Sequence, residues 1–370
     1  MSADVGVGII GAGTIFDQHA RALSDLSDRA RLVGLCEVDE ARLAAAATRH
    51  SIPFACRDHR VLLERPDVDL VVVATPPRYH ADIAIDALHA GKHVVCEKPL
   101  ALNLDAADRV IEVARAHPGR LSVAYQFRYL PEVRRALWLR DSGLLGRLIY
   151  GRFHRFARFR RPGKPERAPW WGRWDVAGGG ALITQLIHEL DLASRLFGRP
   201  VMAWGIIDTL KEEIESEDAS AAMVRFAGGA IVSFQATMSA HRSSAGFDAI
   251  GTLGSAHAPW AFDCLDRRRR DEVRRSALAA VPEAVSAGRS SDHTPYLAAA
   301  LEALVAGMPL PVGPEEARTS LDLATAIYAS ALRGEPVALP VAPSGPGYDG
   351  ISALEYERRT TTGGGLVIAG

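Results

Sequence analysis

Two kinds of apolar pattern divide the chain, and the first covers its N-terminal third. Short apolar runs bounded by polar or turn residues lie at residues 5–10, 32–36, 68–74, 93–96 and 121–124. Segments with helical spacing of apolar residues lie between them, at residues 17–26, 40–49, 79–90 and 104–116. Because strand-like runs alternate with helical segments, this part is predicted to form βαβ units around a parallel sheet.

The pattern changes after residue 126. A helix predicted at 131–141 and an extended segment at 146–161 precede longer strand-like runs at 201–210, 219–226, 230–238 and 247–253. Consecutive strands without intervening helices predict a large, mostly antiparallel open sheet, with a helix containing His188 on one face and closing helices near 295–306 and 314–332. We therefore predict an α/β domain at 1–126, an α+β domain at 127–341 and an irregular tail rich in Gly, Ser and Thr at 342–370.

Composition excludes several classes of protein. The 370 residues are 48% hydrophobic and 24% charged, which suits about two globular domains, and the net charge of −1 does not indicate a nucleic-acid or anionic-membrane surface. No apolar stretch is long enough to span a membrane. The four cysteines lack the spacing of a metal site, and a first strand at residue 5 would leave no room for a signal peptide. We therefore expect a cytoplasmic protein with reduced cysteines and no bound metal.

A glycine-rich turn follows the first predicted strand. In VGVGIIGAGTIFDQHARAL, Gly11 and Gly13 separate the apolar run from a helical segment. Such a turn lets backbone amides approach a pyrophosphate at a helix N-terminus, whose dipole favours negative charge. The second predicted strand ends at Glu37, where a carboxylate can accept from both ribose hydroxyls of NAD and would repel the 2′-phosphate of NADP. NAD is therefore the expected cofactor, with NADP the less favoured alternative if Arg42 accommodates a phosphate.

This fingerprint is incomplete, because Phe16 stands where a third glycine usually allows close packing of helix on strand. Phe16 predicts a slightly displaced helix or a bulky wall near the cofactor. The alternative interpretation is an ordinary strand–turn–helix that binds nothing.

The segment VVVATPPRYHADIAIDALHAGKHVVCEKPLALN carries the strongest signal for chemistry. It predicts a buried strand ending before Thr75 and Pro76, then a helix, then a strand ending before Glu97 and Lys98. The carboxyl ends of parallel strands form the edge at which open α/β sheets bind ligands. We therefore expect Lys98 between cofactor and substrate, where it would hold a substrate hydroxyl and stabilise a developing alkoxide. A surface lysine on a loop is the alternative.

His188 is the candidate for proton transfer. It lies with Asp191 at i and i+3 on a helix predicted to follow three glycines, residues 178–180. Histidine titrates near neutral pH and can take the proton of a secondary alcohol while hydride leaves the same carbon. A structural histidine on this helix is the alternative.

With these features the chain resembles the Gfo/Idh/MocA family, which includes glucose–fructose oxidoreductase, inositol dehydrogenase and rhizopine-catabolism proteins. The resemblance covers roughly residues 4–340 and rests on the joint occurrence of GAGTI, CEVD, ATPPRYH, AGKHVVCEKP, FRYLP, PWWGRW, GGGAL, HELD and IGTLGSA. It implies a Rossmann domain followed by a domain whose open sheet mediates oligomers. It also implies a cis Lys98–Pro99 bond and His188 as the proton acceptor.

The resemblance also implies roles for further side chains. The expected cofactor-binding residues are Gly11, Gly13, Thr14, Ile15, Glu37, Thr75, Pro76, His80, Glu97, Lys98, Gln126 and Trp170. The expected substrate-binding residues are Lys98, Arg128, Thr184, Gln185 and His188. Many relatives carry Asp at the position of Thr184, four residues before the catalytic histidine, and others carry Asn. Thr184 supplies no carboxylate, which argues against inositol as substrate more than against hydride transfer.

Two arginine-rich stretches have no place in this scheme. Residues 152–167 could line a site for a phosphorylated or nucleotide-linked sugar, although a solvated strand face is the favoured interpretation. Residues 266–275 mix both signs of charge and are expected to form a surface loop or a helix.

These features together predict an NAD-dependent oxidoreductase acting on a secondary alcohol or ketone of a sugar, cyclitol or sugar derivative. A glycoside-cleaving enzyme that uses NAD for transient oxidation and a non-catalytic dinucleotide sensor are the alternatives. The expected partner is a small molecule, not nucleic acid or a membrane. The expected assembly is a homo-oligomer, a dimer or tetramer, formed through the second sheet.

Overall fold

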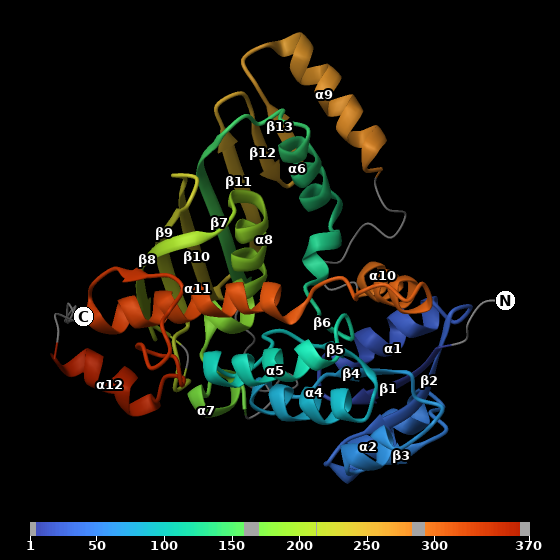
Figure 1. The fold of residues 1–370 in the computed structure, drawn as a ribbon. Coiled ribbons are helices and arrows are strands. Elements are labelled where there is room, and N and C mark those ends of the chain that lie inside the picture. The colour runs from blue at the N-terminus through green and yellow to red at the C-terminus, as the bar shows by residue number, and fades with distance from the viewer. Residues whose placement is uncertain (1–4, 159–169, 212, 283–292, 363–370) are drawn as a thin grey trace. The chain divides into compact units, whose positions relative to one another are not determined.

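The computed structural model describes residues 5–158, 170–211, 213–282 and 293–362, which form two compact units (Figure 1). The first unit contains Met1–Leu130 and Ala287–Arg318, and the second contains Pro131–Ser286 and Thr319–Gly370. The sequence prediction has two successive domains divided at residue 126. The structure differs in that the chain returns to the first unit at 287–318, inside the predicted second domain.

The first unit is built on a six-stranded sheet in the order β3-β2-β1-β4-β5-β6, with every pair of neighbours parallel. Its strands are β1 (Val5–Ile10), β2 (Ala30–Cys36), β3 (Ala55–Cys56), β4 (Leu70–Val73), β5 (His93–Cys96) and β6 (Leu121–Val123). Its helices are α1 (Phe16–Asp25), α2 (Glu40–Arg49), α3 (His59–Leu63), α4 (His80–His89), α5 (Leu104–Ala116) and α10 (Thr294–Val305), with short turns η1 (Pro77–Tyr79) and η2 (Gln126–Tyr129). This strand order is that of a Rossmann fold and confirms the predicted parallel α/β architecture.

The order of the strands reverses between β1 and β4, where such sheets bind ligands beyond their carboxyl ends. Both strands are buried along their whole length, as expected for apolar runs covered on two faces. The loops that follow β1 and β4 therefore leave the sheet at neighbouring points of one edge.

The second unit is built on an eight-stranded sheet in the order β13-β12-β11-β7-β10-β9-β8-β14. Among the strands that the structure describes, only β7 and β10 pair in parallel in this sheet, which confirms the predicted mostly antiparallel sheet. Its strands are β7 (Leu148–Arg158), β8 (Pro200–Asp208), β9 (Ala219–Phe226), β10 (Ile231–Ala240), β11 (Ser244–Gly251), β12 (Ser255–Ala258), β13 (Ala261–Asp263) and β14 (Val337–Ala338). Its helices are α6 (Pro131–Asp141), α7 (Trp174–Ala177), the π-helical turn η3 (Leu182–Leu186), α8 (Ile187–Phe197), α9 (Arg267–Ala280) and α12 (Ala353–Thr362); α11 (Pro314–Arg333) has residues in both units.

Aromatic rings fill one face of this sheet. Phe153 on β7 stacks between Phe234 on β10 and Phe247 on β11, with ring centroids 5.5 Å apart in both pairs. Phe197 at the end of α8 meets Phe153 edge-on at 6.3 Å and Phe226 at 5.7 Å. The helix that contains His188 is therefore fixed to the sheet by aromatic packing, which adds to the burial of apolar area.

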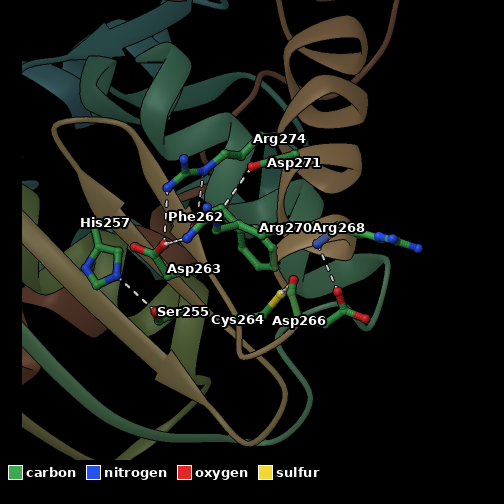
Figure 2. Close-up of polar contacts among 10 residues, drawn as sticks. All are labelled: Ser255, His257, Phe262, Asp263, Cys264, Asp266, Arg268, Arg270, Asp271 and Arg274. Carbon is green, nitrogen blue, oxygen red and sulfur yellow. Dashed lines mark hydrogen bonds and ion pairs between the residues drawn. The ribbon is translucent and has the colours of Figure 1, made fainter.

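The arginine-rich stretch near residue 270 forms helix α9. Asp266 caps its N-terminus by accepting hydrogen bonds from the amides of Arg268 and Arg269. Arg274 donates to the carbonyl of Phe262 at 2.8 Å and pairs with Asp263 at 3.2 Å, which ties α9 to β13 (Figure 2). Of the two alternatives that the mixed charges left open, loop or helix, the structure has the helix.

The predicted irregular tail contains helix α12. Tyr356 is buried, its ring lies 5.4 Å from that of Trp174, and its hydroxyl is 2.8 Å from that of Thr209. The prediction of an irregular tail was wrong for residues 353–362, because the overall Gly, Ser and Thr content does not reveal a short helix anchored by one buried tyrosine. Residues 363–370 of the predicted tail lie outside the described part of the chain. Among the described residues, none of the helices combines the length and the apolar content needed to cross a membrane.

Candidate active site

The glycine turn lies between β1 and α1. Gly11 has a φ of 106°, and a Cβ there would come within 2.6 Å of the carbonyl oxygen of Ala74, so only glycine fits this path. A Cβ at Gly13 would meet no described atom within 4 Å. Thr14 is exposed and Ile15 half-buried at the start of α1. The turn thus leaves open space at the N-terminus of a helix, which fits an anionic group of a cofactor.

Glu37 follows β2 and turns back toward this loop. Its side chain is 8% exposed, and its carboxylate accepts from the amide of Ala12 at 2.8 Å and from the amide of Asp39 at 3.0 Å. Arg42 lies 3.5 Å from the same carboxylate. The acidic group is therefore fixed beside the glycine turn, as the ribose assignment requires.

Phe16, which stands in place of the third glycine of the fingerprint, is buried. Its side chain is 2% exposed and meets the ring of His50 edge-on at 5.3 Å. The ring therefore packs between α1 and the end of α2 inside the first unit and does not form an exposed wall.

Two buried polar atoms lie on the loops after β4 and β6. Thr75 Oγ1 and Gln126 Oε1 are both inaccessible to solvent and have no hydrogen-bond partner within the described part of the chain. Buried polar groups are normally paired, so each such atom needs an explanation. A ligand at this edge of the sheet would supply the missing partners, which fits the predicted cofactor-binding role of both residues.

His80 joins the two loops that carry the motif residues. Its ring nitrogens each lie 2.7 Å from a backbone carbonyl oxygen, one of Thr75 and the other of Pro99, and its side chain is buried. Burial lowers the pKa of His80, whereas the two carbonyl acceptors and Glu97 favour the protonated ring. Both nitrogens are thus taken by backbone, which holds the loop after β4 against the loop containing Lys98. The Lys98–Pro99 bond is cis, as the family resemblance implied.

Glu97, predicted to bind the cofactor, has its carboxylate engaged inside the protein. Its Oε1 atom lies 2.8 Å from Nε2 of His19 and 3.0 Å from Nε2 of His293, while Oε2 accepts from the Lys98 amide at 3.2 Å. Burial would raise the pKa of Glu97, but the hydrogen bonds from both histidines outweigh it and hold the pKa well below its usual range. Burial and the neighbouring His293 lower the pKa of His19. The carboxylate is therefore ionised and fixed beside Lys98.

Sequence reasoning missed both histidines of this cluster. Of the described His, Cys, Asp and Glu residues, only this group is close enough to hold a metal ion, but its separations are those of hydrogen bonds. His19 lies on α1, in the DQHARAL segment that directly follows the glycine turn. His293 lies far along the chain, directly before α10, and no local pattern identifies it.

His188 is near the start of α8 in the second unit, and Asp191 is one turn later; both are buried. The intervening Glu189 is also buried and accepts from Nε of Arg155 at 2.8 Å and from its terminal nitrogen at 2.5 Å. The imidazole therefore lies on a helix that is fixed at its first turn by an ion pair to β7.

Thr184 and Gln185 lie in the π-helical turn η3 that precedes α8, and both are half-buried. The hydroxyl of Thr184 donates to the carbonyl of Gly180 at 2.6 Å. Single π-helical turns are frequent at functional sites, which agrees with the predicted position of these side chains near substrate.

The arginines that were candidates for substrate contact have acidic partners. Arg128 pairs with Glu316 at 2.9 Å, and its guanidinium lies 5.6 Å from the centre of the Tyr125 ring. In the basic stretch, Arg152 pairs with Asp248 at 2.7 Å. Residues 159–167 of that stretch lie outside the described part of the chain, and Trp170 is half-buried just after it.

Two family models match the chain in succession. The model for the oxidoreductase family with an NAD-binding Rossmann fold matches residues 5–125, and the GFO/IDH/MocA C-terminal domain matches residues 133–257. The chain belongs to the Gfo/Idh/MocA family. It is accordingly an NAD-binding oxidoreductase, and the fold and cofactor predicted from its sequence are confirmed.

Individual relatives agree with this assignment. The chain is 29% identical over 305 residues to levoglucosan dehydrogenase of Pseudarthrobacter phenanthrenivorans, covering 73% of this chain and 75% of that one. It is 34% identical over 209 residues to inositol 2-dehydrogenase 2 of Saccharopolyspora erythraea, covering 53% and 55%. The crystal structure of the WlbA dehydrogenase from Bordetella pertussis in complex with NADH and UDP-GlcNAcA is 25% identical, with a TM-score of 0.80 over 92% of this chain and 99% of that one.

Proposed function

We propose that this protein transfers hydride between NAD and a carbon carrying a secondary alcohol or ketone in a sugar, cyclitol or sugar derivative. The observation that carries the proposal is the edge of the parallel sheet where the glycine turn, Glu37 and Lys98 follow the carboxyl ends of β1, β2 and β5. The relatives named levoglucosan and inositol 2-dehydrogenase, and a similar structure containing NADH and a nucleotide-linked sugar acid, support the substrate class.

The residues of the first unit fit NAD. Gly11, Gly13, Thr14 and Ile15 would surround the pyrophosphate, where open space adjoins a helix N-terminus. Glu37 would accept from the ribose hydroxyls of the adenosine half. Further contacts are assigned to the remaining predicted residues, which are Thr75, Pro76, His80, Glu97, Lys98, Gln126 and Trp170. Of these, His80 and Glu97 would act through the loops they hold, because their polar atoms contact other protein groups.

Bound NAD supplies a carbon that accepts hydride from the substrate carbon. His188 takes the proton of the substrate hydroxyl, so the alcohol becomes a ketone as its C–H electron pair leaves with hydrogen. The ammonium of Lys98 donates to the same substrate oxygen and stabilises the negative charge that develops on it. In the reverse direction His188 returns the proton. Arg128, Thr184 and Gln185 are assigned to the rest of the substrate.

The outer face of the second sheet supports the proposed homo-oligomer. Met202, Trp204 and Ile206 on β8 are 45%, 49% and 59% exposed, and Met223 lies directly opposite Trp204 on β9. Tyr150 on β7 is exposed, and so are the apolar residues paired with it, Ile231 on β10 and Ile250 on β11. Contiguous apolar surface of this kind marks interaction sites, and a dimer or tetramer would cover it.

The test is to incubate purified protein with NAD and a panel of free, amino, phosphorylated and nucleotide-linked sugars and cyclitols while following NADH absorbance. The proposal expects NADH with one group of substrates. It also expects Lys98→Ala and His188→Ala to lower kcat on the order of 100-fold or more while NADH binding persists. Full activity in Lys98→Ala would refute the mechanism. Bound dinucleotide without net NADH formation, together with glycoside cleavage, would favour the closed-cycle alternative.

A further inference from the structure

Glu217 is a buried carboxylate that binds the chain just before the His188 helix. It lies in the loop between β8 and β9 and is fully buried. Its carboxylate accepts from the amides of Gly180 and Leu182, both at 2.9 Å, and its backbone carbonyl accepts from the amide of Ala181 at 3.0 Å. One residue therefore satisfies three successive amides at the start of the helical segment, groups that have no partner within a helix.

Glycine is required at positions 179 and 180 because Tyr328 and Glu217 lie very close to the backbone of this turn. Gly179 has a φ of 142°, and a Cβ on it would overlap the hydroxyl of Tyr328. A Cβ on Gly180 would overlap the carbonyl oxygen of Glu217. Tyr328 on α11 completes the arrangement by donating to Glu217 at 2.8 Å. The glycine triplet thus lets a carboxylate and a phenol close tightly on the backbone that leads into the site.

The contacts continue from this turn to the candidate site residues. The carbonyl of Gly180 accepts from both the amide and the hydroxyl of Thr184, at 3.0 and 2.6 Å. Leu182 is the first residue of η3, which runs directly into α8 and His188. We propose that Glu217 is a positioning residue that sets where η3 begins and thereby fixes the imidazole of His188. This inference rests on the proposed function of His188.

The charge of Glu217 supports this role. Burial raises the pKa of Glu217 to about 7. The hydrogen bonds from the turn amides and from the Tyr328 hydroxyl favour the ionised form and oppose this shift. Burial raises the pKa of Tyr328 well above its usual value, so its hydroxyl remains a donor. The acidic neighbours on the same loop bind elsewhere: Glu215 accepts from the Trp174 amide, and Asp218 from the amides of residues 210 and 211. The hydrogen bonds to the turn are therefore strongest when Glu217 is ionised, above neutral pH.

The test compares Glu217→Gln with Asp218→Asn, a matched control in which the next buried carboxylate, also bonded to two amides, is neutralised. In Glu217→Gln the new side-chain amide offers one acceptor atom, so one of the two turn amides would lose its partner. The full-length proteins are assayed at pH 8 for kcat, for NADH dissociation by fluorescence, and for the ¹³Cε1–¹H resonance of His188. The resonance is assigned with His188→Gln.

The expected result for Glu217→Gln is a fall in kcat on the order of tenfold to a hundredfold, because small displacements of a reacting group reduce rate by such factors. NADH affinity should stay the same, and the His188 resonance should move. Asp218→Asn should keep the wild-type resonance and kcat. A folded Glu217→Gln protein with wild-type kcat and resonance would overturn the inference, as would equal effects in Asp218→Asn.

The resonance also separates this inference from the proposed function. If no protein oxidises any substrate on the panel, the proposed function fails, whereas the resonance still reports whether Glu217 controls His188. If Glu217→Gln does not fold, Tyr328→Phe removes one donor to Glu217 and should shift the His188 resonance in the folded protein. An unchanged resonance in Tyr328→Phe would then count against the inference.

Discussion

Replacing His19 by Phe should destabilise the first unit because it removes a donor from the buried carboxylate of Glu97. The substitution keeps an aromatic ring where His19 lies 4.5 Å from the ring of His293, so packing is largely retained. It leaves Oε1 of Glu97 with His293 alone and Oε2 with the Lys98 amide. The experiment therefore measures the hydrogen bond to a charged group and not the loss of a side chain.

The magnitude follows from the burial of both partners, His19 at 0% and Glu97 at 7% side-chain exposure. A hydrogen bond to a charged group contributes about 1.5–3 kcal/mol, and removing one partner of a buried pair costs up to about 3–5 kcal/mol. We expect the free energy of unfolding of this unit to fall by about 2–4 kcal/mol at pH 7. His19→Gln retains an N–H donor and should recover part of the loss.

The pH dependence has a definite sign. Because the pKa of Glu97 is held well below its ordinary value of 4.5, its stabilising contribution is present above pH 4.5 and is lost as pH falls through the folded-state pKa. Folding also lowers the pKa of His19 from its ordinary value of 6.5, so below pH 6.5 the unfolded wild-type chain binds a proton that the folded protein excludes. The difference in unfolding free energy between wild type and His19→Phe should therefore be full at pH 7, begin to narrow below pH 6.5 and narrow further below pH 4.5. A difference that stays constant with pH would mean that the histidine acts through packing.

The assay is native-state hydrogen exchange of the slowest amides in β4 and β5, which reports on the first unit alone. A double-mutant cycle with Glu97→Gln isolates the pair, and we expect a coupling free energy of about 2 kcal/mol. A coupling below about 0.5 kcal/mol, the usual error of additivity, would refute the reasoning.

Three further predictions concern other parts of the molecule. Burial raises the pKa of Glu217 to about 7 in the folded protein, against 4.5 when unfolded. The stability that wild type gains from this difference is therefore full below pH 4.5 and is lost as pH rises through 7, where the buried carboxylate must ionise. In urea unfolding, wild type should lose about 3 kcal/mol relative to Glu217→Gln between pH 4.5 and pH 7.5, and parallel curves would contradict this. Glu37→Ala should weaken NAD binding about tenfold or more by calorimetry and NADP binding less, whereas unchanged NAD affinity would contradict the ribose assignment. Trp204→Glu, on the outer sheet face, should reduce the mass measured by light scattering, and an unchanged oligomer would contradict the assigned interface.

Several strands and helices have the bounds predicted from the sequence, including β1, β5, β9 and α6. Helices α2 and α5 begin and end at the predicted residues, where Asp39 and Asn103 cap them by accepting from amides in the first turn. Strand β3 and helix α3 were missed because two and five residues are too short for a period to be recognised. The return of the chain at 287–318 depends on contacts distant in sequence, which periodicity does not report.

In the candidate site, too, residues with a local sequence pattern were predicted, whereas contacts between distant segments were not. Residues after strand ends and glycine turns could be identified, because parallel strands bring their carboxyl ends to one edge. Glu97 was assigned to the cofactor on its motif alone, whereas its carboxylate is bound by His293, 196 residues away. The partners of Glu217 are likewise 35 and 37 residues away in sequence. His293 and Glu217 therefore hold their partners from remote segments, for which a local pattern gives no signal.

The geometry of Thr184 bears on the kind of substrate the site can accept. From the sequence, this residue stands where relatives often carry a carboxylate, and the expectation was that Thr184 contacts substrate without supplying that charge. In the structure, its single hydroxyl proton is donated to the carbonyl of Gly180, within the turn held by Glu217. Its oxygen therefore offers lone pairs alone, which accept from a hydroxyl and repel a carbonyl or carboxylate. In the proposed substrate-binding role, Thr184 would therefore act as a neutral group where a carboxylate would be charged, which is the physical basis of the argument against inositol.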